Sequence, residues 1–209
     1  MVAASILPVT IHNGNIYFLF GKENEMEDSS KGFSDFGGKV ENGESIINTA
    51  FREGSEELCG FLGNSKDIKQ LIKKQGGIYK LSHNNYHVHI FFMNYDENLP
   101  KYFTNNHRFL WNRMDKNLLN NSKFFEKQEI KWFSINELRT KKNEFRSFYV
   151  EIIDLFLKDI KRITEFINKM KTSRKIYPSK NKSIKNKSIK SKILNFNKTF
   201  KNKTFNKGG

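Results

Sequence analysis

The chain has one cysteine and three prolines among its 209 residues, and it has no long apolar run. A single cysteine, Cys59, excludes an intramolecular disulfide and a thiol-rich metal cluster, so we expect a reducing, intracellular environment. The cytoplasm is the expected location, with the nucleus as the alternative. No apolar segment approaches the ~18 residues of a membrane span, and the first residues carry no basic leader, so we expect no membrane partner.

Acidic residues are missing from the C-terminal part of the chain. Residues 169–209 contain 14 of the 37 Lys and Arg residues and no Asp or Glu, whereas residues 1–168 have a net charge of +1. The formal charge of +15 therefore belongs to this segment and not to a basic fold. Its NKSIK and NKTF units recur every five residues, a period of neither helix nor strand, which is typical of disordered, low-complexity sequence.

Composition and charge together predict two parts. Residues 1–170 form one domain, because a hydrophobic content of 37% suffices for one core, and residues 171–209 form a Lys/Asn-rich tail. Uncompensated lysines attract phosphate without reading sequence, so the tail is a candidate tether for RNA, or a nuclear-import signal. Drift in an A/T-rich coding sequence explains the same composition equally well. The sequence gives no indication of the oligomeric state.

Alternation and β-branched residues predict strands, and apolar residues at helical spacing predict helices. We expect strands over residues 3–12, 16–20, 32–38, 78–82, 86–95 and 129–134. We expect helices over about 45–59, from 135 onward, and as one long amphipathic helix over 144–170, with a short helix or loop over 63–75. Residues 99–123 are expected to be irregular, as an Asn-rich insertion in which aromatic and basic residues either stack on a base or pack under a loop.

Three acids on the first of these helices form the candidate site. If Ser45 caps the helix, then Glu53, Glu56 and Glu57 lie at spacings i, i+3 and i+4, on one face. Such a cluster repels itself unless a hard divalent cation binds it. The alternative is an acidic face exposed to solvent.

The residues around these acids favour the metal interpretation. Gly37 and Gly38 allow a tight turn that brings a backbone carbonyl near the acids, and Glu44 can reach the Arg52 guanidinium and fix the intervening loop. A second pair, His87 and His89, lies on one face of the strand over 86–95. Because no third zinc ligand is evident, substrate contact or packing is the preferred interpretation of these histidines.

The stretch GGKVENGESIINTAFREGSEELCGF, residues 37–61, resembles the signature of the Nudix hydrolases. The matching positions are Gly38, Glu44, Arg52, Glu53, Glu56 and Glu57. Two positions depart from the signature: Gly54 stands where an aliphatic residue is expected, and Cys59 stands where a glycine is expected, with Gly60-Phe61 one residue late. We expect the late glycine to move the end of the helix by one residue.

The resemblance implies an α/β fold, a Nudix-like α/β/α sandwich with a mixed sheet, over roughly residues 3–168. It also implies Mg²⁺ or Mn²⁺ held by Glu53, Glu56, Glu57 and the Gly38 carbonyl, with Glu53 as the first and Glu129 as the second candidate for the general base. The implied reaction is hydrolysis of the pyrophosphate linkage in a nucleoside diphosphate derivative. The resemblance leaves the substrate open among capped RNA, dinucleoside polyphosphates, nucleotide sugars, oxidised nucleotides and diphosphoinositol phosphates.

The basic tail and the aromatic insertion favour an mRNA cap among these substrates. The competing hypothesis is a Nudix-like protein without catalytic activity that binds RNA or a partner through its basic tail. The retention of Glu53, Glu56 and Glu57 argues against it, because a protein that only binds has no need of a repulsive acidic cluster.

Overall fold

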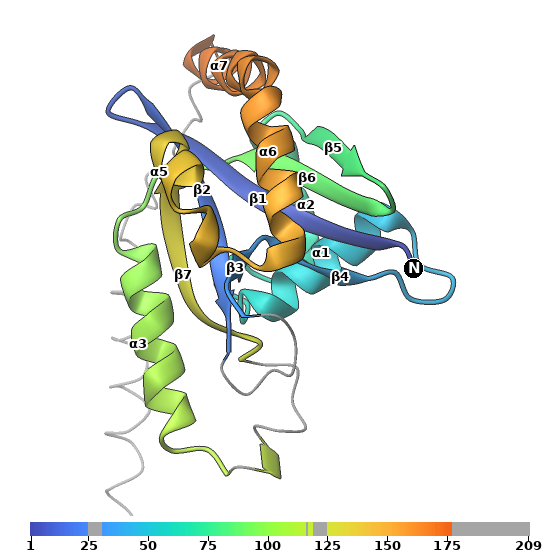
Figure 1. The fold of residues 1–209 in the computed structure, drawn as a ribbon, viewed down its shortest axis with the longest axis vertical. Helices are drawn as coiled ribbons and strands as arrows, with labels where there is room; N and C mark the ends of the chain where they lie inside the picture. The colour runs from blue at the N-terminus through green and yellow to red at the C-terminus, as the bar shows by residue number, and fades with distance from the viewer. Residues whose placement is uncertain (25–30, 116, 119–124, 177–209) are drawn as a thin grey trace, which may run out of the picture. The chain divides into compact units, whose positions relative to one another are not determined.

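The computed structural model describes residues 1–24, 31–115, 117–118 and 125–176 (Figure 1). Residues Met1–Ser173 form one compact unit. The last helix, α7, continues to Ile176, which is six residues beyond the expected domain boundary. The lysine-rich repeats of the predicted tail lie outside the described residues.

Within the described ranges, seven strands form one mixed sheet with the order β3-β2-β1-β6-β5, to which β4 and β7 add by pairing with β1 and β2. The strands are β1 (Ala3–His12), β2 (Asn15–Glu23), β3 (Phe33–Ser34), β4 (Phe36–Lys39), β5 (Tyr79–His83), β6 (Tyr86–Phe92) and β7 (Lys127–Ser134). β1 runs parallel to β6, and the other pairs are antiparallel. The mixed sheet expected from the sequence is confirmed.

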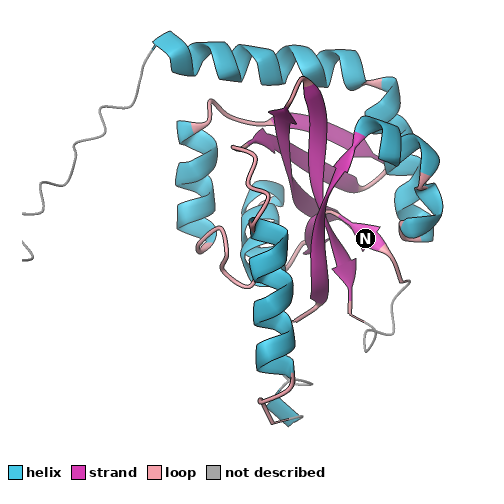
Figure 2. Cartoon of the chain, turned by 90° about the vertical axis from the view of Figure 1, so that its left-hand side faces the viewer, coloured by secondary structure: helices cyan, strands magenta, loops and turns pink. Residues whose placement is uncertain are grey.

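Helices cover both faces of the sheet (Figures 1 and 2). The helical elements are α1 (Ile46–Glu57), α2 (Ser65–Lys74), α3 (Leu99–Trp111), α5 (Ile135–Thr140), η1 (Lys142–Glu144), η2 (Ser147–Tyr149), α6 (Val150–Lys158) and α7 (Ile160–Ile176). Because side chains alternate along a strand, Ile90 and Phe92 join the core beneath α6 and α7, whereas Phe91 joins the core beneath α1, α2 and α3. In the described part of the chain, no helix is long and apolar enough to cross a membrane.

Residues 99–111 are helical, so the expectation of an irregular insertion was wrong there. Asp96 Oδ1 accepts hydrogen bonds from the backbone N–H groups of Asn98 (2.8 Å) and Leu99 (3.2 Å) at the start of α3. Leu99, Phe103 and His107 follow at intervals of four residues, and all three are buried. An apolar stripe of one residue per turn is narrow, so packing specifies this helix more than its Asn-rich composition does.

The long helix expected over residues 144–170 is broken and starts later. Residues 147–149 form a 3₁₀ turn, and the helical axis breaks at Asp159 between α6 and α7. The Asp159 backbone serves both helices, because its N–H donates to Leu155 O (2.9 Å) and its carbonyl accepts from Ile163 N–H (3.1 Å). The apolar residues at helical spacing are buried on both sides of the break, as Phe156 and Ile163 show. Because their spacing continues through Asp159, the sequence pattern predicts one helix where the structure has two.

Candidate metal and hydrolysis site

The acidic helix α1 begins where its capping residue predicts. The Ser45 side chain accepts a hydrogen bond from Asn48 N–H (3.4 Å). At the other end, Cys59 N–H donates to Glu56 O (2.8 Å) and Gly60 N–H donates to Ser55 O (3.0 Å), which together form a Schellman motif. This motif needs a left-handed residue at position 59, and Cys59 adopts φ +49°. The late glycine therefore does not move the helix end, and that expectation was wrong.

At Gly54, the other position that departs from the signature, a residue of the sheet fills the space of the missing aliphatic side chain. A Cβ built at Gly54 would lie 2.2 Å from Cδ1 and 2.5 Å from Cγ1 of Ile6 on β1. Ile6 has no exposed surface, so it occupies the volume that an aliphatic side chain on the helix would otherwise take. The missing side chain is thus replaced by a partner from the sheet.

Arg52 connects the loop before α1 to two of the acids. Its Nε and Nη2 donate to the two carboxylate oxygens of Glu44 at 3.2 and 3.1 Å, and Nη2 also donates to Lys39 O at 3.3 Å. Its Nη1 lies 2.8 Å from Glu53 Oε1 and 3.2 Å from Glu56 Oε2. The hydrogen bond from Arg52 lowers the pKa of the Glu44 carboxyl, so Glu44 is charged at neutral pH.

Gly38 forms a cradle for the Glu53 carboxylate. A Cβ at Gly38 would lie 2.6 Å from Cδ and Oε1 of Glu53, so only glycine lets this carboxylate rest against the β4 backbone. Glu53 also borders a hollow of about 850 Å³ that the loop of residues 39–44 lines. The carboxylate therefore combines a fixed position with access to space that a phosphate group can enter.

Glu57 points away from this hollow, into the protein. It is 4% exposed, and its Oε2 accepts a hydrogen bond from Gly37 N–H at 2.7 Å. Its Oε1 lies 3.3 Å from Nζ of Lys127, which is 1% exposed. Burial raises the pKa of Glu57 well above its ordinary value, while the charge of Lys127 opposes this shift. Burial lowers the pKa of Lys127, but Glu57 and Glu23 reverse this effect and raise it overall.

The described residues fit a divalent cation only in part. Glu53 and Glu56 contact the same guanidinium nitrogen, so their carboxylates lie close together, and hard oxygen donors suit Mg²⁺ or Mn²⁺. Mg²⁺ commonly binds through one or two carboxylates and keeps its remaining ligands as waters and substrate phosphates. Among the described residues, however, no three His, Cys, Asp or Glu side chains form a ready metal-binding group, and Glu57 is engaged by Lys127.

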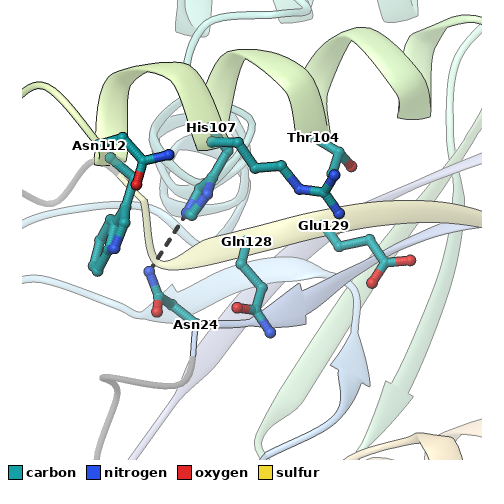
Figure 3. Close-up of a pocket in the computed structure, with 8 residues that line it drawn as sticks. Asn24, Thr104, His107, Asn112, Gln128 and Glu129 are labelled. Carbon is teal, nitrogen blue, oxygen red and sulfur yellow. Dashed lines mark hydrogen bonds between the residues drawn. The ribbon is translucent and has the colours of Figure 1, made fainter.

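Glu129 lies in a second cavity, of about 470 Å³, between β7 and α3 (Figure 3). Figure 3 shows it on the strand beside Gln128, with Asn24, Thr104, His107 and Asn112 around the same space, and Arg108 and Trp111 complete the lining. Asn24 Nδ2 lies 3.4 Å from His107 Nε2. The charge of Glu126 adds to the effect of burial in raising the pKa of Glu57. The role assigned to Glu129 stays a prediction.

Sequence reasoning missed the residues that surround Glu57. Glu23 ends β2, is 5% exposed and contacts both Lys127 and Arg146. No local pattern marks Lys127, since a lysine at the start of a strand ordinarily faces solvent. The polar residues Ser34 and Asp35 are also buried. Long-range pairing decides all of these positions.

The two histidines of β6, His87 and His89, have different surroundings. His89 is buried, with Nδ1 3.0 Å from Ser5 O, and burial lowers its pKa. His87 Nδ1 lies 2.9 Å from Ser82 Oγ. The contacts of His89 agree with packing, which is one of the two preferred interpretations, and a substrate contact of either histidine stays a prediction.

Comparisons with known proteins give matches among solved structures only. No protein-family model and no curated protein matches the sequence. The Ap4A hydrolase of C. elegans, as a binary complex, matches with a TM-score of 0.45 and 16% identity over 76% of this chain and 97% of that one. A mutT/nudix family protein from Listeria innocua matches with a TM-score of 0.42 and 14% identity, over 78% and 94%.

A third match is the NUDIX domain of Shewanella oneidensis NrtR, complexed with ADP ribose, with a TM-score of 0.35 and 11% identity over 67% of this chain and 76% of that one. The names of the second and third matched structures carry the name of the family whose signature the sequence resembles. At these identities and TM-scores, the likeness is no guide to activity or substrate.

Proposed function

We propose that the chain is a Nudix-type, divalent-metal-dependent hydrolase that cleaves the pyrophosphate linkage of a nucleoside diphosphate derivative. The observation that carries this proposal is the set of contacts that the Arg52 guanidinium makes. One guanidinium fixes the loop of residues 39–44 through Glu44, and it brings the carboxylates of Glu53 and Glu56 together beside the hollow that the loop lines. A solvated acidic face would not need such a network.

In this proposal Glu53 and Glu56 hold Mg²⁺ or Mn²⁺ together with the Gly38 carbonyl. The bound cation would neutralise phosphate charge and lower the pKa of an attacking water. Arg52 orients both carboxylates, and the Gly38 cradle fixes Glu53, which is the first candidate to accept the water's proton. Glu57 is the third predicted ligand, and its carboxylate is ion-paired with Lys127. Glu129 remains the second candidate for the base.

The cavity between β7 and α3 is our candidate for the nucleoside side of the substrate. Trp111 stacks on His107 with 5.4 Å between ring centroids, and both rings line the cavity. Burial and the charge of Arg108 lower the pKa of His107, so its ring is neutral at pH 7 and offers an apolar stacking face. Gln128 supplies an amide group for a base edge, while Asn24 Nδ2 donates to Phe125 O and lies 3.4 Å from the His107 ring.

Among nucleoside diphosphate derivatives, we propose capped RNA as the substrate. The outer face of α3 exposes Tyr102 (61%) and Phe109 (55%), seven residues apart, beside Lys101 and Arg108. The guanidinium of Arg113 lies 4.2 Å from the Phe109 ring centroid. Exposed aromatics interleaved with cations suit stacked bases and phosphates of a single strand, and α3 contains no acidic residue.

A substrate panel tests the proposal. The purified chain would be assayed with Mg²⁺ and with Mn²⁺ against capped RNA, a dinucleoside polyphosphate, a nucleotide sugar, an oxidised nucleoside triphosphate and a diphosphoinositol phosphate. We expect hydrolysis of capped RNA to have the highest kcat/KM, and Tyr102→Ala with Phe109→Ala to raise KM for capped RNA but not for the cap dinucleotide. Preference for another substrate would overturn the RNA assignment and leave the hydrolase proposal standing.

The second candidate function is binding without catalysis. The observation that favours it is that Glu53, Glu56 and Glu57 are all ion-paired with Arg52 or Lys127 in the described structure, so each of the three acids has a cationic partner without a metal. RNA or a partner would then bind through the basic tail. Retained RNA binding, together with no turnover of any panel member in Mg²⁺ or Mn²⁺, would favour this function.

A further inference from the structure

Lys127 is a buried cation placed against the acidic helix. Its Nζ lies 3.3 Å from Glu57 Oε1, donates to Ser34 Oγ at 3.0 Å and also contacts Glu23 Oε1. Only 1% of the side chain is exposed. A lysine is rarely buried to this extent unless partners satisfy its charge, so these contacts are the reason that the ammonium lies inside the fold.

An irregularity in the sheet turns Lys127 inward. Ile130 and Trp132 of β7 face the core beneath α1, so strict alternation would direct Gln128 to that side and Lys127 to the opposite face. The pairing with β2 shifts at this point: Lys22 opposes Glu129, and Glu23 opposes Lys127, which leaves Gln128 as an extra residue. This β-bulge reverses the alternation and directs the lysine toward Glu57.

A glycine on the neighbouring strand makes room for the lysine stem. A Cβ at Gly21 would lie 2.9 Å from Cγ of Lys127 and 2.8 Å from Cε1 of Phe36. Both distances are below any real Cβ contact, so a larger residue at position 21 would displace the stem. The bulge thus directs Lys127 inward, and the missing side chain at Gly21 leaves the space that its stem occupies.

The charges of the four residues in direct ion contact balance. Glu23 Oε1 accepts a hydrogen bond from Arg146 Nη1 at 2.6 Å in addition to its contact with Lys127. The internal ion cluster of Glu23, Glu57, Lys127 and Arg146 therefore has two negative and two positive groups. Bringing a divalent ion onto Glu57 would place it a few ångströms from the ammonium in a buried site, where repulsion is weakly screened.

We propose that Lys127 is a built-in cation that takes the place of a divalent ion at Glu57, so that metal binding rests on Glu53 and Glu56. The inference rests on the proposed function in taking a divalent ion to bind at those two carboxylates. Glu57 then stabilises the turn at Gly37 and the inner end of α1, and it does not ligate the metal. Lys127 is a positioning residue for this arrangement.

Mn²⁺ binding to the full chain, followed by electron paramagnetic resonance of free Mn²⁺, tests the proposal without any substrate. We expect Glu57→Gln to leave the Kd for Mn²⁺ within about threefold of the wild-type value, and Glu53→Gln to weaken it by about tenfold or more. Lys127→Met should add a Mn²⁺ site, because Glu57 and Glu23 lose their ammonium partner. Lys131→Met removes the same charge from a partly exposed position of the same strand and should leave the number of sites unchanged.

A double variant covers the case in which Lys127→Met does not fold. Glu57→Gln with Lys127→Met removes one charge of each sign and leaves Glu23 paired with Arg146. We expect this double variant to melt at a higher temperature than either single variant, because breaking a buried pair costs more than removing it. Its Kd for Mn²⁺ should equal that of the wild type.

Three results decide the matter. Loss of Mn²⁺ affinity of about tenfold in both Glu57→Gln and the double variant would make Glu57 a ligand and overturn the proposal. A wild-type chain that binds no Mn²⁺ would contradict the proposed function, and in that case Lys127→Met must create a site for the inference to stand. A double variant less stable than both single variants would contradict the pairing itself.

Discussion

Arg52 and Glu44 form a two-point ion pair, with Nε 3.2 Å from Oε1 and Nη2 3.1 Å from Oε2. Because Nη1 of the same guanidinium reaches Glu53 and Glu56, one side chain couples the loop to both proposed metal ligands. A planar group with donors on two edges can do this, and an ammonium cannot.

Replacing Arg52 by lysine should therefore disturb both the loop and the acids. We expect Arg52→Lys to lower the free energy of unfolding by about 1–2 kcal/mol and to weaken Mn²⁺ binding, as the parallel hydrogen bonds are lost. Urea unfolding and Mn²⁺ titration measure the two effects. The matched control is Arg162→Lys, since Arg162 is 77% exposed and lies 3.7 Å from Asp159. Wild-type behaviour of Arg52→Lys in both measurements would show that the network does not organise the site.

Gly38→Ala should separate function from stability. Its Cβ would lie 2.6 Å from the Glu53 carboxylate, which is the mobile end of a flexible side chain and can move at little cost to the fold. We expect the melting temperature to change by no more than a few degrees, whereas Mn²⁺ affinity and turnover fall by about tenfold as Glu53 leaves its cradle. Unchanged Mn²⁺ affinity would show that Glu53 is not held there for a metal.

Gly54→Ala should destabilise the protein although alanine favours helices. The gain in helix propensity is about 1 kcal/mol, and overpacking against the fully buried Ile6 costs about 1–3 kcal/mol. Ile6→Ala removes the clashing atoms, so in a double-mutant cycle the two changes should couple favourably by about 1 kcal/mol or more. Additive effects in urea unfolding would contradict the complementary packing of positions 6 and 54.

Asp35 should make stability depend on pH. The residue is buried, with Ser5 and Tyr86 hydroxyls donating to its carboxylate, and burial raises its pKa from 3.8 to about 6. Between those pH values the unfolded chain loses the proton and the folded chain keeps it, so stability falls as pH rises from about 4 to 6. The full effect is about 3 kcal/mol, and it persists above pH 6.

The comparison that isolates this effect is Asp35→Asn, whose side chain does not titrate. We expect the difference in unfolding free energy between wild type and variant to change with pH between 4 and 6 and to be constant above that range. A difference that stays constant from pH 4 to 7 would show that Asp35 ionises equally in both states.

The sheet and the acidic helix could be predicted because short-range signals specify them. β1 begins and ends at the expected residues, Ala3 and His12, and Ser45 caps α1 as its type predicts. The helix α3 could not be predicted in this way, since its stripe of Leu99, Phe103 and His107 is narrow and its surface residues are poor helix formers. Its conformation depends on packing beside β7, which is separated from it in sequence.

The contacts of the candidate site also divide into those that local sequence predicts and those that depend on distant residues. The contact of Arg52 with Glu44 spans a short loop and was predicted from the sequence, and the contact of Arg52 with Glu56 has the i, i+4 spacing of neighbours on a helix. The pairing of Glu57 with Lys127 depends on a bulge seventy residues away, and no local pattern reports a bulge. Three acids at helical spacing thus do not all point into one cavity.

The central claim is that Glu53 and Glu56 hold a divalent cation for hydrolysis of a pyrophosphate linkage. The most direct measurement is turnover of capped RNA and of a dinucleoside polyphosphate as a function of Mg²⁺ concentration, for the wild type and for Glu53→Gln. The account predicts no turnover in excess chelator, saturation with added Mg²⁺, and a loss of at least about a hundredfold in kcat for Glu53→Gln with its melting temperature preserved. Undiminished turnover in excess chelator, or wild-type kcat in Glu53→Gln, would contradict it.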